Sequence, residues 1–510
     1  MQSRKDQVQA HMFVMGRLVS GMLRQDPDAP ESPVGRTNRG LAWGIGLGVV
    51  LVVGFLLFGM ISPAGTKSWR TTNALIVQKE TGTRYLYLDG RLRPVLNYAS
   101  ARLVSRTAPA PVIVSTESLR GEPHGTPVGI PGAPDTLPGP GDLEQGAWQV
   151  CADPPLATGP DGSGRTARTS LRIGFATGGA FPGKREGVLV AGPDGNTYLL
   201  WGDHRMRIGG HGALQALGWS GTATVPVTAA LLDSLPAGAD LVAPEVDGRG
   251  TESGRIGGAA ARVGQVFALS SPGTDRQYFL LEKAGLRPLT PLAAALVLGD
   301  DRTGRQAYRG GAPTALTLTA DELTRRQAPG GKPPAGATAA AGSSTASPTD
   351  SSAVPADWPA TPPPARSAAG SALCAQIQPE GLVPLVRLAL VSESGSLPEP
   401  ASGPGIASAC LPVNGIAVRP GGGALVQALG AGGGVRGTTT YLVTDIGVKY
   451  RLTDATSVER LGLKGGHAQA VPSRLLDMLP TGPRLDVTAA LAGGPAAGTD
   501  GSSSSDANCR

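Results

Sequence analysis

Histidine and cysteine, on which most metal sites and many nucleophilic enzymes depend, are scarce in this sequence. Among 510 residues there are 5 His and 4 Cys. No carboxylate or Cys lies at a ligand spacing around His204 and His211, so we interpret both as surface residues. The sequence also contains no G-x-S-x-G elbow and no H-E-x-x-H helix. We therefore predict no catalytic residue and no metal site.

Aromatic residues are also rare, at 4% of the chain, and no basic stripe is interleaved with them. Proteins that bind single-stranded nucleic acid combine both features. The formal net charge is +6, and the basic residues are mainly Arg. They are spread along the chain and form no basic stripe. We therefore expect no nucleic-acid partner.

One stretch comes close to a phosphate-binding loop. In GGAFPGKR, residues 178–185, Gly178, Gly183 and Lys184 have the spacing G-x-x-x-x-G-K. Arg185 stands where that motif needs a Ser or Thr hydroxyl for magnesium, and Pro182 removes a backbone donor. We interpret the stretch as an ordinary glycine-rich loop and expect no cofactor.

Residues 41–61 contain no charged side chain. As a helix they extend roughly 30 Å, which is enough to cross the hydrocarbon core of a membrane. The basic residues nearby are Arg4, Lys5, Arg17, Arg24, Arg36 and Arg39 before the segment, and Lys67 and Arg70 after it. The positive-inside rule therefore predicts a single-pass anchor in the cell membrane, with residues 1–40 in the cytoplasm and 62–510 outside.

The cytoplasmic segment is predicted to contain an amphipathic helix over residues 3–24. Its apolar residues recur at steps of three and four, on one face: Val8, Met12, Met15, Val19 and Met22. An isolated helix of this length is marginal in water, so its apolar face needs a partner. That partner is either another protein subunit or the membrane interface.

Two nearly identical octapeptides occur far apart, LLDSLPAG at 231–238 and LLDMLPTG at 475–482. The similarity extends upstream, where one tyrosine holds the same place in each of four stretches. These tyrosines are Tyr85, Tyr198, Tyr278 and Tyr441. We therefore predict four diverged repeats.

Each repeat is predicted to be a hairpin followed by helical turns. Residues 85–95 alternate between apolar and polar around Asp89-Gly90, a tight-turn signal. Leu231, Leu232 and Leu235 then have helical spacing. Strand-like sequence on both sides of the second and third repeats predicts one central β domain built from two discontinuous pieces.

The predicted fold is therefore α+β: a single N-terminal transmembrane helix, then an extracytoplasmic domain of four small hairpin-plus-helix repeats around a central discontinuous β domain. The predicted segments are a cytoplasmic amphipathic helix (1–40), the transmembrane helix (41–61), the first repeat (62–128), the N-terminal piece of the central β domain (129–186), the second repeat (187–261), the third repeat (262–331), a disordered linker (332–370), the C-terminal piece of the central β domain (371–436), the fourth repeat (437–491) and a disordered tail (492–510).

Several stretches, in this order, resemble one known family. They are the RKDQVQAHMFVMGRLVSGMLRQDP helix, the uncharged span, YLYLDGRLRPV, GIPGAPD, WQVCADP and a late RPGGGALV. In this combination the sequence resembles EccB, the membrane subunit of type VII (ESX) secretion systems. The resemblance implies a membrane complex with EccC, EccD and EccE, contact with the mycosin protease, and self-association. It also implies similarity of the repeats to a cell-wall-binding fold of phage lysins, and hence contact with the cell wall.

Three functions follow from this resemblance and from the residues. The first is a structural subunit whose outer domain scaffolds or gates the export path. The second is an extracytoplasmic ATPase, because members of the family have been described as ATPases; ATP is implied by the resemblance alone. The third is a stand-alone wall anchor. The incomplete loop at 178–185 favours the first over the second, and the amphipathic cytoplasmic helix favours it over the third.

All four cysteines follow the predicted span, where disulfides persist. We favour a Cys151–Cys374 bond, because both cysteines border the discontinuous domain and the family pattern has a Cys at each place. Local pairing of Cys374 with Cys410 is the alternative; a Cys410–Cys509 bond is possible but less favoured, because Cys509 lies in a Ser-rich tail.

Overall fold

The structure is a computed structural model of the chain. It describes residues 4–24, 33–61, 67–70, 74–105, 108–158, 164–175, 178–180, 185–210, 212–328, 354–366, 371–379, 383–392, 397–430 and 435–493. The chain divides into two compact units. One unit comprises residues 1–93 and 110–125, and the other comprises residues 94–109 and 126–510.

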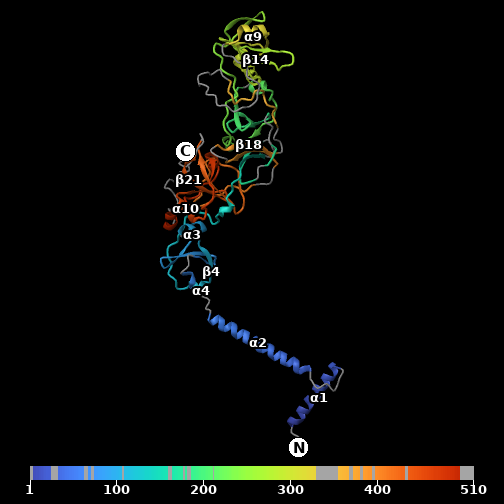
Figure 1. Cartoon of the computed structure of the whole chain (residues 1–510), viewed down its shortest axis with the longest axis vertical. Helices are drawn as coiled ribbons and strands as arrows, with labels where there is room; N and C mark the ends of the chain where they lie inside the picture. The colour runs from blue at the N-terminus through green and yellow to red at the C-terminus, as the bar shows by residue number, and fades with distance from the viewer. Residues whose placement is uncertain are drawn as a thin grey trace. The chain divides into compact units, whose positions relative to one another are not determined.

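Two helices form the N-terminal region of the first unit, drawn in blue in Figure 1: α1 (Arg4–Arg24) and α2 (Pro33–Ile61). Proline suits the first turn of α2, because its fixed φ is helical and the backbone N–H that it lacks would have no partner there. The window Thr37–Leu57 of α2 is long and apolar enough to cross a membrane. α1 corresponds to the helix predicted at 3–24, whereas α2 contains the predicted span 41–61 but begins eight residues before it, at Pro33.

The first unit also contains a four-stranded sheet of order β3-β2-β1-β4, in which β1 pairs antiparallel with β2 and parallel with β4. Its elements are η1 (Ser68–Arg70), β1 (Ala74–Gln78), β2 (Arg84–Leu88), β3 (Arg91–Pro94), β4 (Ala110–Val114) and α4 (Thr116–Leu119). Asp89 and Gly90 both have positive φ between β2 and β3, as the predicted tight turn requires.

The second unit contains three more four-stranded sheets. Their orders are β9-β8-β7-β10, β15-β14-β13-β16 and β22-β21-β20-β23. In each sheet the strand that comes last along the chain pairs parallel with the strand that comes first along the chain: β10 with β7, β16 with β13 and β23 with β20. Their strands are β7 (Gly187–Ala191), β8 (Thr197–Trp201), β9 (His204–Ile208), β10 (Val225–Pro226); β13 (Val266–Leu269), β14 (Gln277–Glu282), β15 (Gly285–Leu289), β16 (Leu316–Thr317); and β20 (Gly423–Leu429), β21 (Val435–Thr444), β22 (Lys449–Leu452), β23 (Gln469–Pro472). All four sheets thus share one strand order.

Short helices follow the third and fourth strands of these sheets. They are α3 (Tyr98–Val104), α5 (Ala213–Ala216), α6 (Ala229–Asp233), α7 (Pro291–Leu298), α8 (Asp301–Gln306), α9 (Ala320–Arg326), α10 (Ala455–Arg460), α11 (Ser473–Asp477) and α12 (Val487–Ala492). A two-stranded hairpin, β11 (Glu252–Ile256) and β12 (Ala259–Arg262), precedes β13.

The four tyrosines noted in the sequence each lie in the second strand of a four-stranded sheet. Tyr85, Tyr198, Tyr278 and Tyr441 pair respectively with Ile76, Val190, Ala268 and Val426 of the first strand. All four tyrosines are half-buried and pack against an apolar cluster. The phenol therefore covers the edge of each core rather than its centre.

The fifth large sheet has the order β18-β17-β5-β6-β19. Its strands come from two distant regions of the chain: β5 (Trp148–Thr158) and β6 (Gly164–Ile173), then β17 (Ala372–Gln378), β18 (Leu385–Val391) and β19 (Gly415–Val418). One face of this sheet enters the largest apolar cluster, through residues such as Trp148, Leu171 and Ile377. The leucines of both octapeptides enter the same cluster, which explains why that sequence occurs twice.

Two boundaries differ from those predicted. The sequence assigns β20 to the C-terminal piece of the central β domain (371–436), but this strand pairs with β21 and β23. The fourth four-stranded sheet therefore begins at Gly423 rather than at 437. The predicted disordered linker (332–370) includes residues 354–366, which the structure places in contact with the second and third four-stranded sheets. The rest of that linker, and the chain after Gly493, lie outside the described residues.

Candidate functional site

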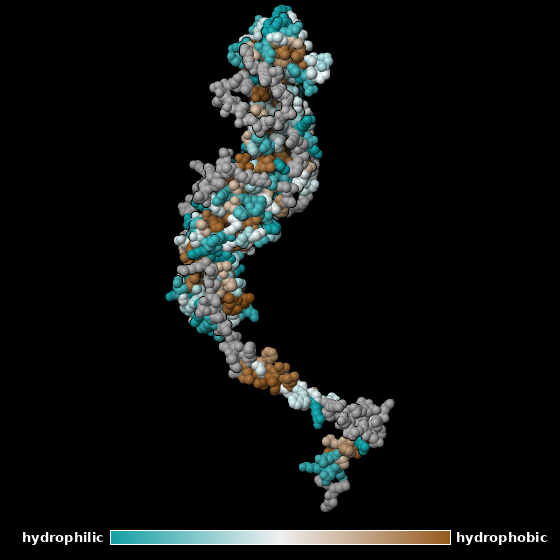
Figure 2. Space-filling model, viewed as in Figure 1, coloured by the Kyte–Doolittle hydropathy of each residue, from teal (hydrophilic) through white to brown (hydrophobic). Residues whose placement is uncertain are grey.

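The two N-terminal helices carry apolar surface that nothing in the described chain covers. Along α1, the predicted apolar face is exposed, from 46% at Val19 to 85% at Met22. None of the candidate span in α2 is buried against protein. Figure 2 shows this helix as a hydrophobic band. Surfaces of this extent are typical of membrane or protein contacts.

A carboxylate is buried in the sheet that follows the span. The side chain of Glu122 is 1% exposed, and it forms ion pairs with Arg70 and Lys67, the latter at 3.0 Å. Burial alone would raise the pKa of Glu122, but the hydrogen bonds from Arg70 and Lys67 outweigh it and hold that pKa below its usual value. Both basic residues that follow the span are thus fixed to the first sheet, beside the buried Trp69.

The five-stranded sheet is cross-linked by a disulfide between Cys151 of β5 and Cys374 of β17, which lie directly opposite each other. The S–S distance is 2.08 Å, and both residues are fully buried. Cys374 therefore does not pair with Cys410, the local alternative that the sequence left open. Cys410 is also disulfide-bonded, and Cys509 lies outside the described residues.

The glycine-rich loop at 178–185 is described only at its ends, because residues 181–184, with Lys184, lie outside the described residues. Its first residues are bonded to the five-stranded sheet. The amide of Ala180 donates to the carbonyl of Leu390 at 2.9 Å, and Gln376 donates to the carbonyl of Gly178 at 2.9 Å. The backbone donor at Ala180 is thus already used by β18 and is not directed at an anion.

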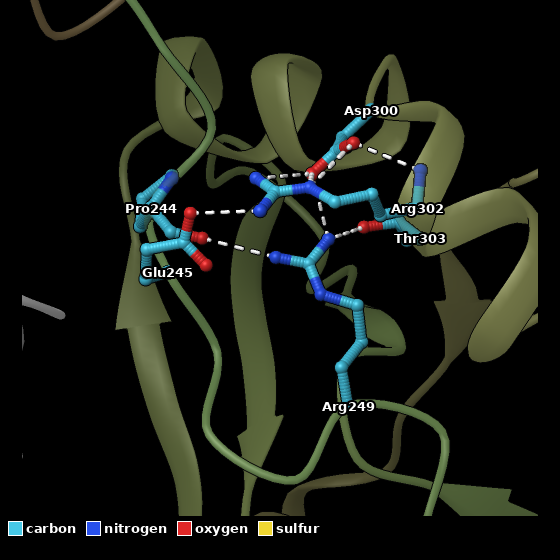
Figure 3. A network of polar contacts seen from close by, with 6 residues as sticks. All are labelled: Pro244, Glu245, Arg249, Asp300, Arg302 and Thr303. Atoms are coloured by element: carbon cyan, nitrogen blue, oxygen red, sulfur yellow. Dashed lines mark hydrogen bonds and ion pairs between the residues drawn. The ribbon is translucent and has the colours of Figure 1, made fainter.

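A charged network that the sequence did not indicate surrounds Asp300, the N-cap residue of α8 (Figure 3). Arg249 donates to Asp300 at 2.7 Å and also contacts Thr303, while Arg302 bridges Asp300 and Glu245, the latter at 2.8 Å. Burial by itself raises the pKa of Asp300, but hydrogen bonds from Arg302 and the charge of Arg249 outweigh it and lower that pKa. Because Arg249 lies 51 residues before Asp300, no local pattern could have predicted the pair.

A cavity of about 700 Å³ adjoins this network, between α5 and α7. Its polar lining includes Asp300, Asp301, Arg305 and Tyr278. Asp300 is already neutralised by two guanidinium groups, so it cannot serve as a free base. Among the described residues, no group of three or more His, Cys, Asp or Glu side chains could hold a metal ion. The network can therefore fix α8 against the loop at 244–249, and it does not assemble a reaction centre.

These features define a protein with one candidate membrane span and several small sheets, braced by a disulfide and ion pairs. A family model described as "Type VII secretion system ESX-1, transport TM domain B" matches residues 1–496. The chain belongs to this family, the EccB proteins of type VII secretion systems.

Named relatives support this assignment. The chain is 31% identical over 326 residues to the ESX-2 secretion system ATPase EccB2 of Mycobacterium tuberculosis, covering 62% of this chain and 63% of the relative. It is 28% identical over 318 residues to the ESX-3 secretion system ATPase EccB3 of Mycolicibacterium smegmatis, covering 59% and 58%. The match thus spans less than two thirds of each relative's length.

Two solved structures share the fold. The chain resembles one in an intact ESX-5 inner membrane complex with a TM-score of 0.58 and 20% identity, covering 99% of this chain and 98% of that one. It also resembles EccB3 in a dimer from the ESX-3 core complex, with a TM-score of 0.57 and 23% identity, covering 82% and 99%.

Proposed function

We propose that this protein is a membrane-anchored structural subunit of a type VII secretion machine, and that its outer domain scaffolds or gates the export path. The observation that carries this proposal is the uncovered apolar surface of α1 and α2. A lipid bilayer covers such a surface on α2, and a helix as long as α1 needs a partner for its apolar face.

The proposed orientation places residues 1–40 in the cytoplasm and 62–510 outside. Basic residues before the span outnumber those after it. Lys67 and Arg70, which follow the span, are paired with Glu122, so their charges are partly neutralised. The disulfide at Cys151 also suits an oxidising compartment.

The proposed architecture of the outer region is four repeats around a central β domain of two discontinuous pieces. The shared strand order of four sheets supports the repeats. The five-stranded sheet, built from residues 148–173 and 372–418 and joined by the disulfide, supports the central domain. A cross-linked central sheet of this kind suits a scaffold.

The proposed partners are the membrane subunits EccC, EccD and EccE, together with the mycosin protease, a second copy of this chain and the cell wall. Relatives have been solved within an ESX inner membrane complex and as a dimer, which supports membrane-complex partners and self-association. We assign docking of the membrane subunits to the apolar face of α1.

The substitution Met15→Asp tests this assignment, because it places a charge in the middle of that face. We expect the variant to insert into the membrane normally and to lose the co-purifying membrane subunits. Gln9→Asp adds the same charge outside the face and should leave co-purification unchanged. Normal co-purification with Met15→Asp would show that the face contacts lipid or nothing at all.

The second candidate function is ATP hydrolysis outside the cytoplasm, favoured by the names of the relatives. The bonding of Ala180 and Gly178 to the five-stranded sheet speaks against an anion-binding loop at 178–185. We expect Lys184→Ala to leave secretion unchanged. If that variant lost both secretion and the ATP hydrolysis of purified protein, the ATPase function would replace the structural one.

A further inference from the structure

Residues 354–366 form an ordered, proline-rich segment that we call the strap. Its sequence is VPADWPATPPPAR. Trp358, Pro359 and Pro363 are buried, while residues between them, such as Ala360 and Thr361, are exposed. Trp358 belongs to an apolar cluster whose other members come from both the second and the third four-stranded sheets. The strap thus extends across two sheets.

On the side of the second sheet, the strap is held by hydrogen bonds to its backbone and to one acidic side chain. Asp357 accepts from the amide of Ala239 at 2.7 Å. The indole N–H of the buried Trp219 donates to the carbonyl of Pro363 at 3.0 Å. Gly187, at the start of β7, donates to Pro364 at 3.1 Å and accepts from Arg366 at 2.8 Å.

On the side of the third sheet, the strap contacts the N-terminus of α7. The carbonyl of Ala360 accepts from the amide of Leu292 at 3.2 Å. The first amides of a helix have no partner within the helix, and the helix dipole favours an electronegative group there. The carbonyl of Ala360 therefore caps the amide of Leu292, which has no hydrogen-bond partner within α7.

The contacts of residues 362–366 match the way proteins bind extended proline-rich peptides, whereas residues 355–358 form a turn in which the amide of Trp358 donates to the carbonyl of Pro355 at 3.3 Å. Proline has no N–H and a fixed φ, so a proline-rich segment is extended before it binds and loses little entropy. Aromatic grooves bind such segments through indole donors, backbone bonds and apolar contacts. In the strap, the carbonyls of Ala360, Pro363 and Pro364 accept hydrogen bonds, Trp358 packs in an apolar cluster, and Pro363 is buried.

We propose that the strap is an internal ligand, and that the surface formed by Trp219, Ala239, Leu292 and Gly187 is a binding groove for an Asp-Trp-Pro-x-x-Pro-Pro segment that begins in the turn at 355–358 and continues into the proline run at 362–364. The occupant of this groove is residues 354–366 of the same chain. In binding there, the strap joins the second and third four-stranded sheets into one body. This assignment is independent of the role of the chain in secretion.

A matched pair of substitutions tests the groove in the full-length protein in detergent. Asp357→Ala removes the acceptor for the amide of Ala239, whereas Asp357→Asn keeps an oxygen in that position. By hydrogen exchange, we expect the amides of Ala239 and Leu292 to exchange about tenfold faster in Asp357→Ala. The variant loses the hydrogen bond between Asp357 and the amide of Ala239, and the free energy of one hydrogen bond corresponds to about a tenfold change in the local opening equilibrium. Asp357→Asn and the exposed Thr361→Ala should exchange like the natural protein. Equal exchange in Asp357→Ala would overturn the proposal.

A second experiment supplies the ligand from outside. In full-length protein with residues 354–366 replaced by a Gly/Ser segment of equal length, we expect the amides of Gly187, Ala239 and Leu292 to lose protection. A synthetic peptide of residues 354–366 should restore it, and a scrambled peptide should not. Unchanged protection after replacement, or equal effects of the two peptides, would refute an internal ligand. If the chain with the replaced segment does not fold, the comparison of Asp357→Ala with Asp357→Asn still tests the proposal.

Discussion

The backbone amide of Lys449 donates to the carbonyl of Pro480 at 2.9 Å. Gly482 returns a hydrogen bond to the carbonyl of Lys449 at 2.9 Å, so the Pro-x-Gly segment pairs with the third strand of the fourth sheet. The same two bonds join Arg205 to Pro236 and Gly238, and Leu92 to Pro123 and Gly125. A Pro-x-Gly segment, which ends both octapeptides and also occurs at 123–125, therefore closes each of these three sheets through its backbone.

The glycine that ends the Pro-x-Gly segment is required in the fourth sheet, because Gly482 lies against the buried ring of Tyr450. A Cβ at position 482 would overlap the ring of Tyr450, which is 1% exposed. We expect Gly482→Ala to lower the free energy of unfolding by about 1–3 kcal/mol, measured by urea titration, because overpacking a core costs this much. The equivalent Gly125→Ala meets the flexible stem of Arg93 at 2.8 Å and should cost less. Equal losses would show that the close approach to Tyr450 is unimportant.

The Cys151–Cys374 bond closes a loop with a sequence separation of 223. In the chain-entropy model, a loop of this length restricts the unfolded chain by about 5 kcal/mol, an upper value. We expect the double variant Cys151→Ser/Cys374→Ser to unfold at a lower temperature than the natural protein. Under reducing conditions, the two proteins should converge. Non-reducing peptide mapping must give a 151–374 cross-linked peptide, and a 374–410 peptide would contradict the structure.

The elements of the fold that local patterns determine could be predicted from the sequence. The uncharged run at 41–61 suffices for α2, and Asp89-Gly90 suffices for the turn after β2, because neither depends on distant residues. β20 was assigned to the wrong sheet, because Gly423–Leu429 is largely apolar and suits either one. Only long-range pairing decides which sheet such a strand joins.

The strap and the Asp300 network could not be predicted for a related reason. A polyproline segment has no apolar period, and composition alone suggested disorder for residues 354–366. Its partner Trp219 lies 144 residues from Pro363. The disulfide was easier, because few cysteines leave few pairings, and the family pattern favoured Cys151 with Cys374.

The proposed orientation in the membrane has a direct test. Among the described residues no cysteine is free, so in a Cys410→Ser/Cys509→Ser background, which keeps the buried Cys151–Cys374 bond, an impermeant thiol reagent should label only an introduced cysteine. In intact cells, we expect no labelling of Ser32→Cys and strong labelling of Thr274→Cys, since Thr274 is exposed and lies in the proposed outer region. Both variants should be labelled after the cells are lysed. Labelling of Ser32→Cys in intact cells would reverse the orientation.

A final prediction concerns Lys449, whose ammonium group is buried and donates to the carbonyl of Leu476. Burial lowers the pKa of Lys449 to about 8, from a usual value of 10.5, although the charge of Asp477 opposes this shift. Between these two pH values the unfolded chain binds more protons than the folded one, so stability should rise with pH across this window. Below pH 8 the full penalty for the buried charge, on the order of 3 kcal/mol, is present.

Lys449→Met removes this dependence, because its side chain is of similar length and carries no charge. We therefore expect the free energy of unfolding of the natural protein, measured in urea by a signal from the residues after the span, to increase from pH 8 to pH 10.5 relative to the variant. The variant should be the more stable of the two at pH 7 if the penalty exceeds the loss of the bond to Leu476. Parallel pH profiles for both proteins would show that Lys449 is already solvated in the folded state, and that its position beside Pro480 is set by the backbone bonds alone.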